Sequence, residues 1–369
     1  MNKPKIAFVI PTLGSGGAER VVSTLCNTLV EFYSVHIICL IKTTPFYKIH
    51  SDVKICYCID KKNSSVSTIN AIKNNYKLIK KIKKIAALNE IDLLISFITS
   101  ANVLTIIAGK LLNIPVIVSE RNNPEKDYLP KMWRTLRNLL FPLAKLIVVQ
   151  TEDIKNFYEK KVDKNKVAII PNPISSDFII SPSYEECSVS KENIILNVGR
   201  LNPQKAQHIL IKAFANSENL NWKLYIVGAG VEQKKLEVLI ENLKLKKKVF
   251  LLGKVKDIQK VYQKSKIFAF SSLFEGSPNA LIEAMHFGLA CVSTDCPTGP
   301  SDLINNGKNG FLINVNDTNA LTEKLNILMS DKDLRISFGK NAQSTVSEFD
   351  ASNISNKWSF HIDQCLNNT

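Results

Sequence analysis

The sequence predicts an α/β protein with two doubly wound parallel sheets. Short apolar runs alternate with helical patterns along the chain, and most runs are apolar throughout rather than at every second position. Such runs are typical of strands that are buried on both faces of a parallel sheet and connected by helices. The chain has 369 residues, a length that favours two domains at about 150 residues each.

The strand signals fall into two groups. The first group lies at 6–10, 35–40, 93–97, 116–118 and 146–149, and the second at 194–198, 223–227, 249–252, 267–270 and 290–292. Helical patterns lie between them, for example at 18–30 and 131–143. The alternation pauses at Ile170-Pro171-Asn172-Pro173-Ile174 and in the polar stretch 175–192, which is rich in turn formers and predicts a hinge near residue 180.

These signals divide the chain into three parts. We expect a first domain at 1–180, a second at 181–350, and a C-terminal helix at 351–369 that packs back on the first domain. The N-terminal apolar run is too short for a signal peptide, and no segment offers about 18 uninterrupted apolar residues, so we expect no membrane-spanning helix. The eight cysteines lack zinc-like spacing, and we expect them to be reduced thiols.

The formal net charge is +15, which favours acidic partners such as nucleic acid, anionic lipid headgroups or phosphorylated substrates. The charge is concentrated in two stretches. Six lysines lie within 73–84, interleaved with apolar residues, and Lys131, Arg134 and Arg137 repeat at every third position. Both patterns are typical of basic amphipathic helices at a membrane surface, although a solvated lysine face on an ordinary helix gives the same pattern.

Ligands of open parallel sheets bind beyond the carboxyl ends of the strands, and three loops at such ends carry suitable chemistry. In the first, Gly16 and Gly17 open a helix and let the backbone approach a phosphate or sugar. This signal is weak, because the loop lacks the Walker lysine and the GxGxxG spacing and a plain tight turn would look the same. In the second loop, Arg200 and Lys205 could converge on a diphosphate.

The third loop leads into a helix and is the most informative of the three. Its sequence is Phe274-Glu275-Gly276-Ser277-Pro278-Asn279-Ala280-Leu281-Ile282-Glu283. Pro278 suits the first turn of a helix, where uncovered N–H groups and the helix dipole favour a phosphate. Glu275 and Glu283 could then hydrogen-bond a sugar and a ribose on opposite sides of a diphosphate. The alternative is a helix-capping proline with two solvated glutamates.

In the order and spacing of these motifs the chain resembles the retaining glycosyltransferases of family 4. The motifs are Gly16-Gly17-Ala18-Glu19, Ile170-Pro171-Asn172-Pro173, Gly199-Arg200-Leu201 with Lys205, Val227-Gly228-Ala229-Gly230 and the element from Glu275 to Glu283. Within the family it is most similar to bacterial N-acetylgalactosaminyltransferases that extend undecaprenyl-diphosphate-linked glycans. That likeness rests on Gly16-Gly17-Ala18-Glu19-Arg20, Ile95-Ser96-Phe97, Val118-Ser119-Glu120-Arg121 and the basic helix at 131–137.

The resemblance implies the GT-B fold, with two Rossmann-like domains facing a central cleft and a C-terminal helix that crosses back to the first domain. Arg200 and Lys205 would neutralise the departing diphosphate, and Glu275 would hold hydroxyls of the transferred sugar. The nucleotide sugar would also contact Gly16, Gly17, Gly253, Val255, Ser277, Pro278, Asn279, Ala280, Leu281 and Glu283. Among these, Glu283 would hold the ribose hydroxyls, and Gly253 and Val255 would meet the base through main-chain groups.

The acceptor would be bound by Arg121, Lys131, Arg134 and Arg137. On the helix, the last three are expected to form one cationic ridge that receives the acceptor's diphosphate. Family members often carry a histidine after the strand at 116–118, where this chain has Arg121 nearby. If Arg121 occupies the position of this histidine, the hydrogen bond that the histidine gives to the donor sugar would come from a cation or from another group.

The mechanism expected from the resemblance depends on charge. Negative charge builds on the diphosphate oxygens in the transition state, and fixed cations stabilise it there. Arg200 and Lys205 could replace a divalent metal, and we assign no Asp-x-Asp metal motif, so we expect neither a metal nor another cofactor. Hydrolysis by Glu275 and Glu283 is the poorer interpretation, because eight residues of helix would separate them by about 12 Å and a retaining glycosidase needs about 5 Å.

We therefore expect a glycosyltransferase that transfers a hexose or N-acetylhexosamine to a polyprenyl-diphosphate-linked oligosaccharide. The first candidate for the donor is UDP-linked N-acetylgalactosamine. The reaction would belong to the assembly of a bacterial surface polysaccharide or glycan. The protein would be cytoplasmic and peripheral on the anionic cytoplasmic face of the inner membrane. A GT-B-fold sugar-nucleotide epimerase is an alternative. A basic nucleic-acid-binding protein is a further alternative that we disfavour, because no nucleic-acid-binding signature occurs and the element from Glu275 to Glu283 would stay unexplained.

Overall fold

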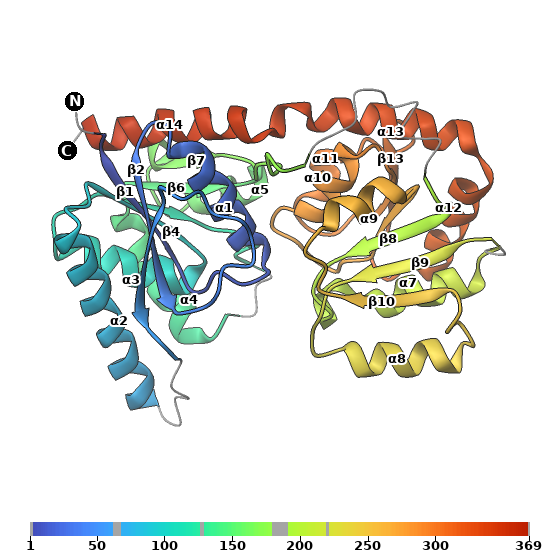
Figure 1. Ribbon diagram of the computed structural model, residues 1–369, viewed down its shortest axis with the longest axis horizontal. Helices are drawn as coiled ribbons and strands as arrows, with labels where there is room; N and C mark the ends of the chain where they lie inside the picture. Colours follow the sequence, from blue (N-terminus) through green and yellow to red (C-terminus); the bar gives the residue numbers. More distant parts are fainter. Residues whose placement is uncertain (1–2, 62–67, 126–128, 179–190, 219–220, 368–369) are drawn as a thin grey trace. The chain divides into compact units, whose positions relative to one another are not determined.

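The computed structural model describes residues 3–61, 68–125, 129–178, 191–218 and 221–367 (Figure 1). The chain divides into two compact units, Met1–Ser175 with Phe349–Thr369, and Ser176–Glu348. Each unit has one parallel sheet whose strands are connected mainly by helices, so the predicted α/β architecture with two doubly wound halves is confirmed. The hinge predicted near residue 180 lies outside the described residues.

The sheet of the first unit has the strand order β3-β2-β1-β4-β5-β6-β7, and all of its pairs are parallel. Its strands are β1 Lys5–Ile10, β2 Ser34–Ile41, β3 Lys54–Ile59, β4 Leu93–Phe97, β5 Val116–Ser119, β6 Leu146–Val149 and β7 Val167–Ile169. The edge strands β3 and β7 were not among the predicted strands, because most of their residues are only partly buried and they lack a long apolar run. The order reverses between β1 and β4, which makes their carboxyl ends the switch point where ligands bind in such sheets.

The second unit repeats this arrangement with the order β10-β9-β8-β11-β12-β13. Its strands are β8 Ile194–Val198, β9 Lys223–Val227, β10 Val249–Gly253, β11 Ile267–Phe270, β12 Ala290–Thr294 and β13 Gly310–Ile313. The switch point lies between β8 and β11. The loops after these two strands carry Arg200, Lys205 and Glu275, so the expected cations and carboxylate follow the strands that flank the switch point.

Helices connect the strands in both units. The first unit contains α1 Gly17–Leu29, α2 Thr68–Leu88, α3 Thr99–Lys110, α4 Lys131–Leu140, η1 Phe141–Leu143, α5 Glu152–Glu159, η2 Lys164–Lys166 and α14 Ala351–Asn367. The second contains η3 Pro203–Lys205, α7 Gln207–Asn216, α8 Gln233–Asn242, α9 Ile258–Lys264, α10 Asn279–His286, α11 Pro300–Leu303, α12 Thr318–Ser330 and α13 Lys332–Val346, and η4 Ser347–Phe349 leads back to the first. None of the helices within the described ranges is long and apolar enough to cross a membrane.

The C-terminal helix α14 packs against α1 and β4, as predicted (Figure 1). Trp358 is fully buried and stacks on Phe97 of β4, with ring centroids 5.8 Å apart. The Tyr33 hydroxyl donates to Asp363 Oδ1 at 2.7 Å, and Thr28 of α1 bonds Ser355. Burial of a tryptophan and two side-chain hydrogen bonds therefore fix the end of the chain to the first unit.

Candidate active site

Lys205 and Glu275 form an ion pair at the switch point of the second unit. The Lys205 ammonium lies 2.5 Å from Glu275 Oε1, and the exposed fractions of the two side chains are only 16% and 8%. Lys205 also lies 4.9 Å from the centre of the Phe270 ring. The sequence predicted both residues as site residues in separate loops, and the structure brings them into direct contact.

Hydrogen bonds between the two loops explain this contact. Gln204 accepts from the Leu273 N–H at 2.8 Å through its carbonyl oxygen and donates its side-chain amide to the Phe274 carbonyl at 2.8 Å. The Ser271 hydroxyl donates to the Lys205 carbonyl at 2.9 Å. The loop after β8 is therefore hydrogen-bonded to the loop after β11, and Lys205 is held beside Glu275.

Two glycines after β9 allow the Gly199-Arg200-Leu201 loop to pack closely. Gly228 has φ +145°, and a Cβ there would lie 1.8 Å from the Gly199 carbonyl oxygen. A Cβ on Gly230 would lie 2.2 Å from the carbonyl oxygen of Leu201. Only glycine fits either position, so the Val227-Gly228-Ala229-Gly230 motif acts by supporting the loop that carries Arg200.

The Arg200 side chain is exposed, and its guanidinium has no protein partner within the part of the chain that the structure describes. The Arg200 carbonyl oxygen accepts from the Gln207 side-chain amide at 3.1 Å and from the Asn202 N–H at 3.0 Å. A cation held on a buried scaffold but left open to solvent is free to bind a phosphate.

Helix α10 begins one residue later than expected, with Pro278 as its N-cap rather than in its first turn. The Asn279 N–H donates to the Ser277 carbonyl at 3.0 Å and the Leu281 N–H to the Pro278 carbonyl at 2.9 Å. The Ala280 N–H has no protein acceptor among the described residues. Of the backbone donors expected from Ser277 to Leu281, the Ala280 N–H, like that of Ser277, is therefore available to a phosphate oxygen.

The loop after β12 holds the start of α10 in place. Gly299 has φ +100°, and a Cβ there would lie 2.6 Å from Pro278 Cδ. The Thr298 hydroxyl donates to the Glu275 carbonyl, and the Glu275 N–H donates to the Pro297 carbonyl at 3.3 Å. The sequence analysis missed this Pro297-Thr298-Gly299 support, although a proline and glycine directly after a strand signal could have indicated it.

Glu283 lies inside α10 and is only 4% exposed. The Tyr262 hydroxyl of α9 donates to Glu283 Oε2 at 2.9 Å. Tyr262 was not predicted, because no local pattern relates it to a glutamate two elements further along the chain. This hydrogen bond restrains Glu283 and excludes the alternative of a solvated glutamate.

The residues expected to meet the base are at the end of β10. Gly253 has φ +65°, and a Cβ there would meet no atom within 4 Å. Its carbonyl oxygen accepts from the Gly228 N–H at 2.8 Å, and Val255 is half-buried in the following loop. The Gly253 turn is therefore hydrogen-bonded to the Gly228 turn, which supports Arg200.

In the first unit, the glycine loop opens α1 as expected. Gly16 is the N-cap of α1 and Gly17 its first residue. A Cβ on Gly16 would lie 2.0 Å from Glu19 Oε2, because the Glu19 side chain folds back over the loop and accepts from the Thr12 hydroxyl at 3.1 Å. The space beside Gly16 is therefore occupied by the movable end of the Glu19 side chain, and a carboxylate lies next to the loop.

Arg121 follows β5 at the carboxyl edge of the same sheet. Its guanidinium lies 4.4 Å from the centre of the Phe97 ring, and Nη1 donates to Asn172 of the Ile170-Pro171-Asn172-Pro173 motif. Burial lowers the pKa of Arg121 to about 9, so the group stays charged at neutral pH. Nε and Nη2 have no protein partner within the described ranges.

The carboxylate of Glu120 is buried beside Arg121. It accepts from the Thr99 hydroxyl at 3.1 Å and from the Tyr158 hydroxyl at 3.2 Å. Ile98, which directly precedes Thr99, has φ +76°, an unusual and strained conformation for a β-branched residue. Neither feature was predicted, and together they mark the carboxyl ends of β4 and β5 as a built site rather than a plain loop.

The predicted cationic ridge on α4 is wrong in one of its three residues. Lys131 and Arg134 are exposed, but Arg137 is only 2% exposed and donates to the Pro124 carbonyl at 3.0 Å. The spacing of three residues turns slowly around the helix, and by Arg137 it has reached the side that packs on the domain. The ridge therefore consists of Lys131 and Arg134.

The lysine-rich segment forms α2, as expected. Ile82 is fully buried, and Ile79 and Ile85 pack partly against the core. Three apolar side chains near the start of the helix are instead exposed, namely Ile69 at 65%, Ile72 at 57% and Tyr76 at 58%. All six lysines of α2 are exposed, and the helix contains no acidic residue.

The expectation that the chain lacks an Asp-x-Asp motif is wrong, because Asp331-Lys332-Asp333 has this spacing. Asp331 is the N-cap of α13, and its carboxylate accepts from the Leu334 N–H at 2.8 Å. The triplet therefore begins a helix. No group of three His, Cys, Asp or Glu side chains suited to a metal ion occurs among the described residues.

Two family models match the chain, Glycosyltransferase Family 4 over residues 15–178 and Glycosyl transferases group 1 over residues 185–345. The GalNAc-α-(1→4)-GalNAc-α-(1→3)-diNAcBac-PP-undecaprenol α-1,4-N-acetyl-D-galactosaminyltransferase of Campylobacter jejuni is 32% identical, covering 96% of this chain and 97% of the relative. The N-acetylgalactosamine-N,N'-diacetylbacillosaminyl-diphospho-undecaprenol 4-α-N-acetylgalactosaminyltransferase of the same organism is also 32% identical, covering 94% and 96%.

Solved structures show the same fold. Anabaena HepE in complex with UDP-glucose has a TM-score of 0.81 at 20% identity, covering 98% of this chain and 99% of that chain. Sucrose-phosphate synthase from Thermosynechococcus elongatus has a TM-score of 0.83 at 16% identity, with full coverage of both chains. The predicted GT-B fold is confirmed, and the epimerase alternative gains no support from these comparisons.

Proposed function

Because the chain belongs to glycosyltransferase family 4, we propose that it transfers an N-acetylhexosamine from a UDP-linked donor to a polyprenyl-diphosphate-linked glycan in bacterial polysaccharide assembly. N-acetylgalactosamine is the first candidate, since two relatives at 32% identity are named as N-acetylgalactosaminyltransferases of undecaprenyl-diphosphate glycans. UDP as the nucleotide is supported by the UDP-glucose complex of HepE. The observation that carries the proposal is the Lys205–Glu275 pair at the switch point of the second unit.

The donor's diphosphate would bind between Arg200, Lys205 and the Ala280 N–H. Lys205 donates one hydrogen bond to Glu275 and keeps two N–H donors for phosphate oxygens, while exposed Arg200 offers its whole guanidinium. As the bond to the sugar breaks, negative charge grows on the diphosphate, and these groups stabilise the transition state more than the ground state. Catalysis would then need no metal, and the sugar would keep its anomeric configuration.

Two carboxylates would bind hydroxyl groups of the donor. Glu275 Oε2 would accept from hydroxyls of the sugar, and Glu283, restrained by Tyr262, would accept from the ribose. Gly253 and Val255 would meet the base. Gly16 and Gly17, where α1 begins, stay proposed contacts of the nucleotide sugar through their backbone.

The acceptor would bind to the first unit. We assign its diphosphate to Lys131 and Arg134, which are exposed on α4, and assign Arg121 to the edge of its site through the two nitrogens that have no protein partner among the described residues. The six exposed lysines of α2, beside exposed Ile69 and Ile72, suit an anionic bilayer. The enzyme would thus work as a peripheral protein on the cytoplasmic face of the inner membrane.

A direct test incubates the purified protein with a short-chain polyprenyl-diphosphate glycan and one donor at a time: UDP-N-acetylgalactosamine, UDP-N-acetylglucosamine, UDP-galactose or UDP-glucose. Mass analysis should show one preferred donor, with turnover that persists in EDTA and an α-linkage by NMR. Lys131→Gln with Arg134→Gln should raise the KM for the acceptor and leave UDP affinity unchanged. Release of free sugar without a glycolipid product, or interconversion of the donors, would contradict the proposal.

A further inference from the structure

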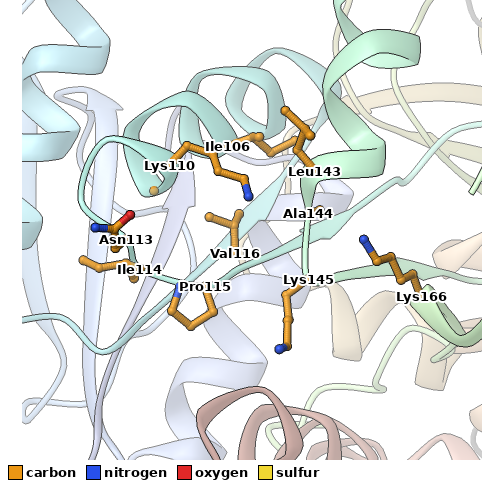
Figure 2. A pocket seen from close by; sticks show the side chains of 11 residues that line it. Ile106, Lys110, Asn113, Ile114, Pro115, Val116, Leu143, Ala144, Lys145 and Lys166 are labelled. Atoms are coloured by element: carbon orange, nitrogen blue, oxygen red, sulfur yellow. The ribbon is translucent and has the colours of Figure 1, made fainter. Parts of the chain in front are cut away.

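A pocket of about 330 Å³ lies in the first unit at the amino ends of β5 and β6 (Figure 2). It is bounded by the last turn of α3, the loop that leads into β5, η1 and the side chain of Lys166. Its volume is at the lower end of the range for small-ligand sites, about 300–1,000 Å³. Because it opens at the amino ends of the strands, it is separate from the residues assigned to the acceptor at their carboxyl ends.

Three lysines and no acidic residue line this pocket. Figure 2 shows the ammonium ends of Lys110 and Lys166 directed toward the pocket from opposite sides, whereas the ammonium end of Lys145 points away from them. Lys166 donates one hydrogen bond to the Pro142 carbonyl at 3.1 Å and keeps two further protons. Lys110 is exposed and has no protein partner within the described part of the chain. This charge is complementary to an anion.

The rest of the lining is mostly apolar, with Ile106, Val116 and Leu143 among its side chains. A bare inorganic anion would make no use of this surface. Leu143 is 47% exposed at the pocket, and Leu111, next to Lys110, is 58% exposed. Leucines left in contact with water around a cationic pocket are typical of a surface that meets a lipid bilayer.

We propose that this pocket binds the headgroup of an anionic phospholipid. The phosphate would lie between Lys110 and Lys166, the glycerol would contact the accessible lining residues Pro115 and Leu143, and the acyl chains would stay in the bilayer beside Leu111 and Leu143. The pocket is too small to hold the chains as well. This inference rests on the proposed function in one respect, because it assumes that the acceptor is bound to a membrane.

The pocket and the assigned acceptor residues are connected by one helical segment. Helix α4 starts at Lys131 and leads directly into η1, which ends at Leu143. The two ends are about 18 Å apart at 1.5 Å per residue. A lipid held at Leu143 would keep α4 along the membrane surface, with Lys131 and Arg134 at the height of lipid diphosphates.

The test compares two lysine pairs that differ only in position. Lys110→Gln with Lys166→Gln changes the pocket, and Lys234→Gln with Lys247→Gln makes the same charge change at two exposed positions of the second unit. Calorimetry with short-chain dihexanoyl phosphatidylglycerol as monomers should show saturable binding to the wild-type protein and to this control variant. The pocket variant should bind at least about tenfold more weakly, since each lysine near an anionic lipid contributes roughly a fivefold factor.

Measurements with inorganic phosphate and with further variants distinguish a lipid site from a plain anion site. Inorganic phosphate should bind much more weakly than the lipid, and Leu143→Asp should weaken lipid binding without removing a charge from the lysines. Equal affinity for phosphate would reduce the pocket to a plain anion site, and unchanged lipid affinity in the pocket variant would overturn the proposal. Lys110→Gln alone, which breaks no described contact, controls for misfolding. UDP binding and turnover of a soluble acceptor are measured separately from lipid binding. If neither UDP binding nor turnover is observed, the proposed function is contradicted, whereas the proposed lipid site is not affected.

Discussion

The ammonium nitrogen of Lys205 lies 2.5 Å from a carboxylate oxygen of Glu275, and both side chains are largely buried. Sequence reasoning assigned the lysine to the diphosphate and the glutamate to the sugar. The structure joins them, so that the two proposed binding functions meet at the position of the bond that would break. A change in either residue therefore affects the other.

Replacement of Arg200 or Lys205 should lower the catalytic rate in both cases, but only replacement of Lys205 should also lower the stability of the fold. Arg200→Ala and Lys205→Ala should each lower kcat by about 10²–10³ with little change in the donor KM, because the charge they stabilise grows in the transition state. Lys205→Ala should also lower the free energy of unfolding by about 1–3 kcal/mol, since it leaves Glu275 buried without its partner. Urea denaturation beside steady-state kinetics measures both, and equal stability of the two variants would contradict the coupling.

Glu283→Gln should weaken free UDP and the UDP-sugar to the same degree, because contacts with the ribose are the same in the ground and transition states. Tyr262→Phe should give a smaller loss of UDP affinity, about 0.5–1.5 kcal/mol, since it removes only the hydrogen bond that restrains Glu283. Calorimetry with UDP measures both. Unchanged UDP affinity in Glu283→Gln would remove this residue from the ribose site.

Gly228→Ala should disrupt the donor site from outside it. The added Cβ would lie 1.8 Å from the Gly199 carbonyl oxygen, so the loop that carries Arg200 must move, at a cost of about 2 kcal/mol or more. Gly14→Ala is the matched control, since its Cβ would meet nothing closer than 3.9 Å. Thermal unfolding and UDP affinity should change only in Gly228→Ala, and normal UDP binding by that variant would refute the close approach.

Trp358→Ala should lower the free energy of unfolding by about 3–5 kcal/mol, because the side chain is fully buried against Phe97. Phe360→Ala on the same helix should change it by less than about 1 kcal/mol, since Phe360 is 59% exposed. Denaturant titration compares the two. Similar losses in both variants would show that α14 is held by something other than the tryptophan.

The protein should lose stability in mild acid. Burial lowers the pKa of His36, His208, His286 and His361 below their ordinary value of 6.5, so the folded state keeps them neutral. The unfolded chain binds protons more readily than the folded state, and the free energy of unfolding should therefore fall as the pH is lowered through the ordinary histidine pKa of 6.5. His36→Leu should flatten this dependence, because His36 is only 2% exposed. A slope unchanged in His36→Leu would exclude this histidine as a contributor.

Most of both sheets could be predicted from local patterns, and the missed strands are all edge strands. Continuous apolar runs identify strands buried on both faces, such as β1 and β8. The missed strands β3, β7 and β13 are partly exposed, and β7 and β13 are also short, whereas the edge strand β10 was predicted from its apolar run. The register and order of the strands come from pairing between distant segments, which no window of sequence contains.

The site divides in the same way. Residue types and spacing were enough to propose Arg200, Lys205, Glu275 and Glu283 as site residues, because phosphate and hydroxyl recognition needs cations and carboxylates at strand ends. The contact of Lys205 with Glu275 and the restraint of Glu283 by Tyr262 depend on loops that meet only in the folded sheet. The burial of Arg137 likewise depends on which face of α4 packs on the domain. Residue types that can bind phosphate or hydroxyl groups can be recognised in the sequence. The neighbours and the exposure of each side chain depend on packing and are defined only once the chain has folded.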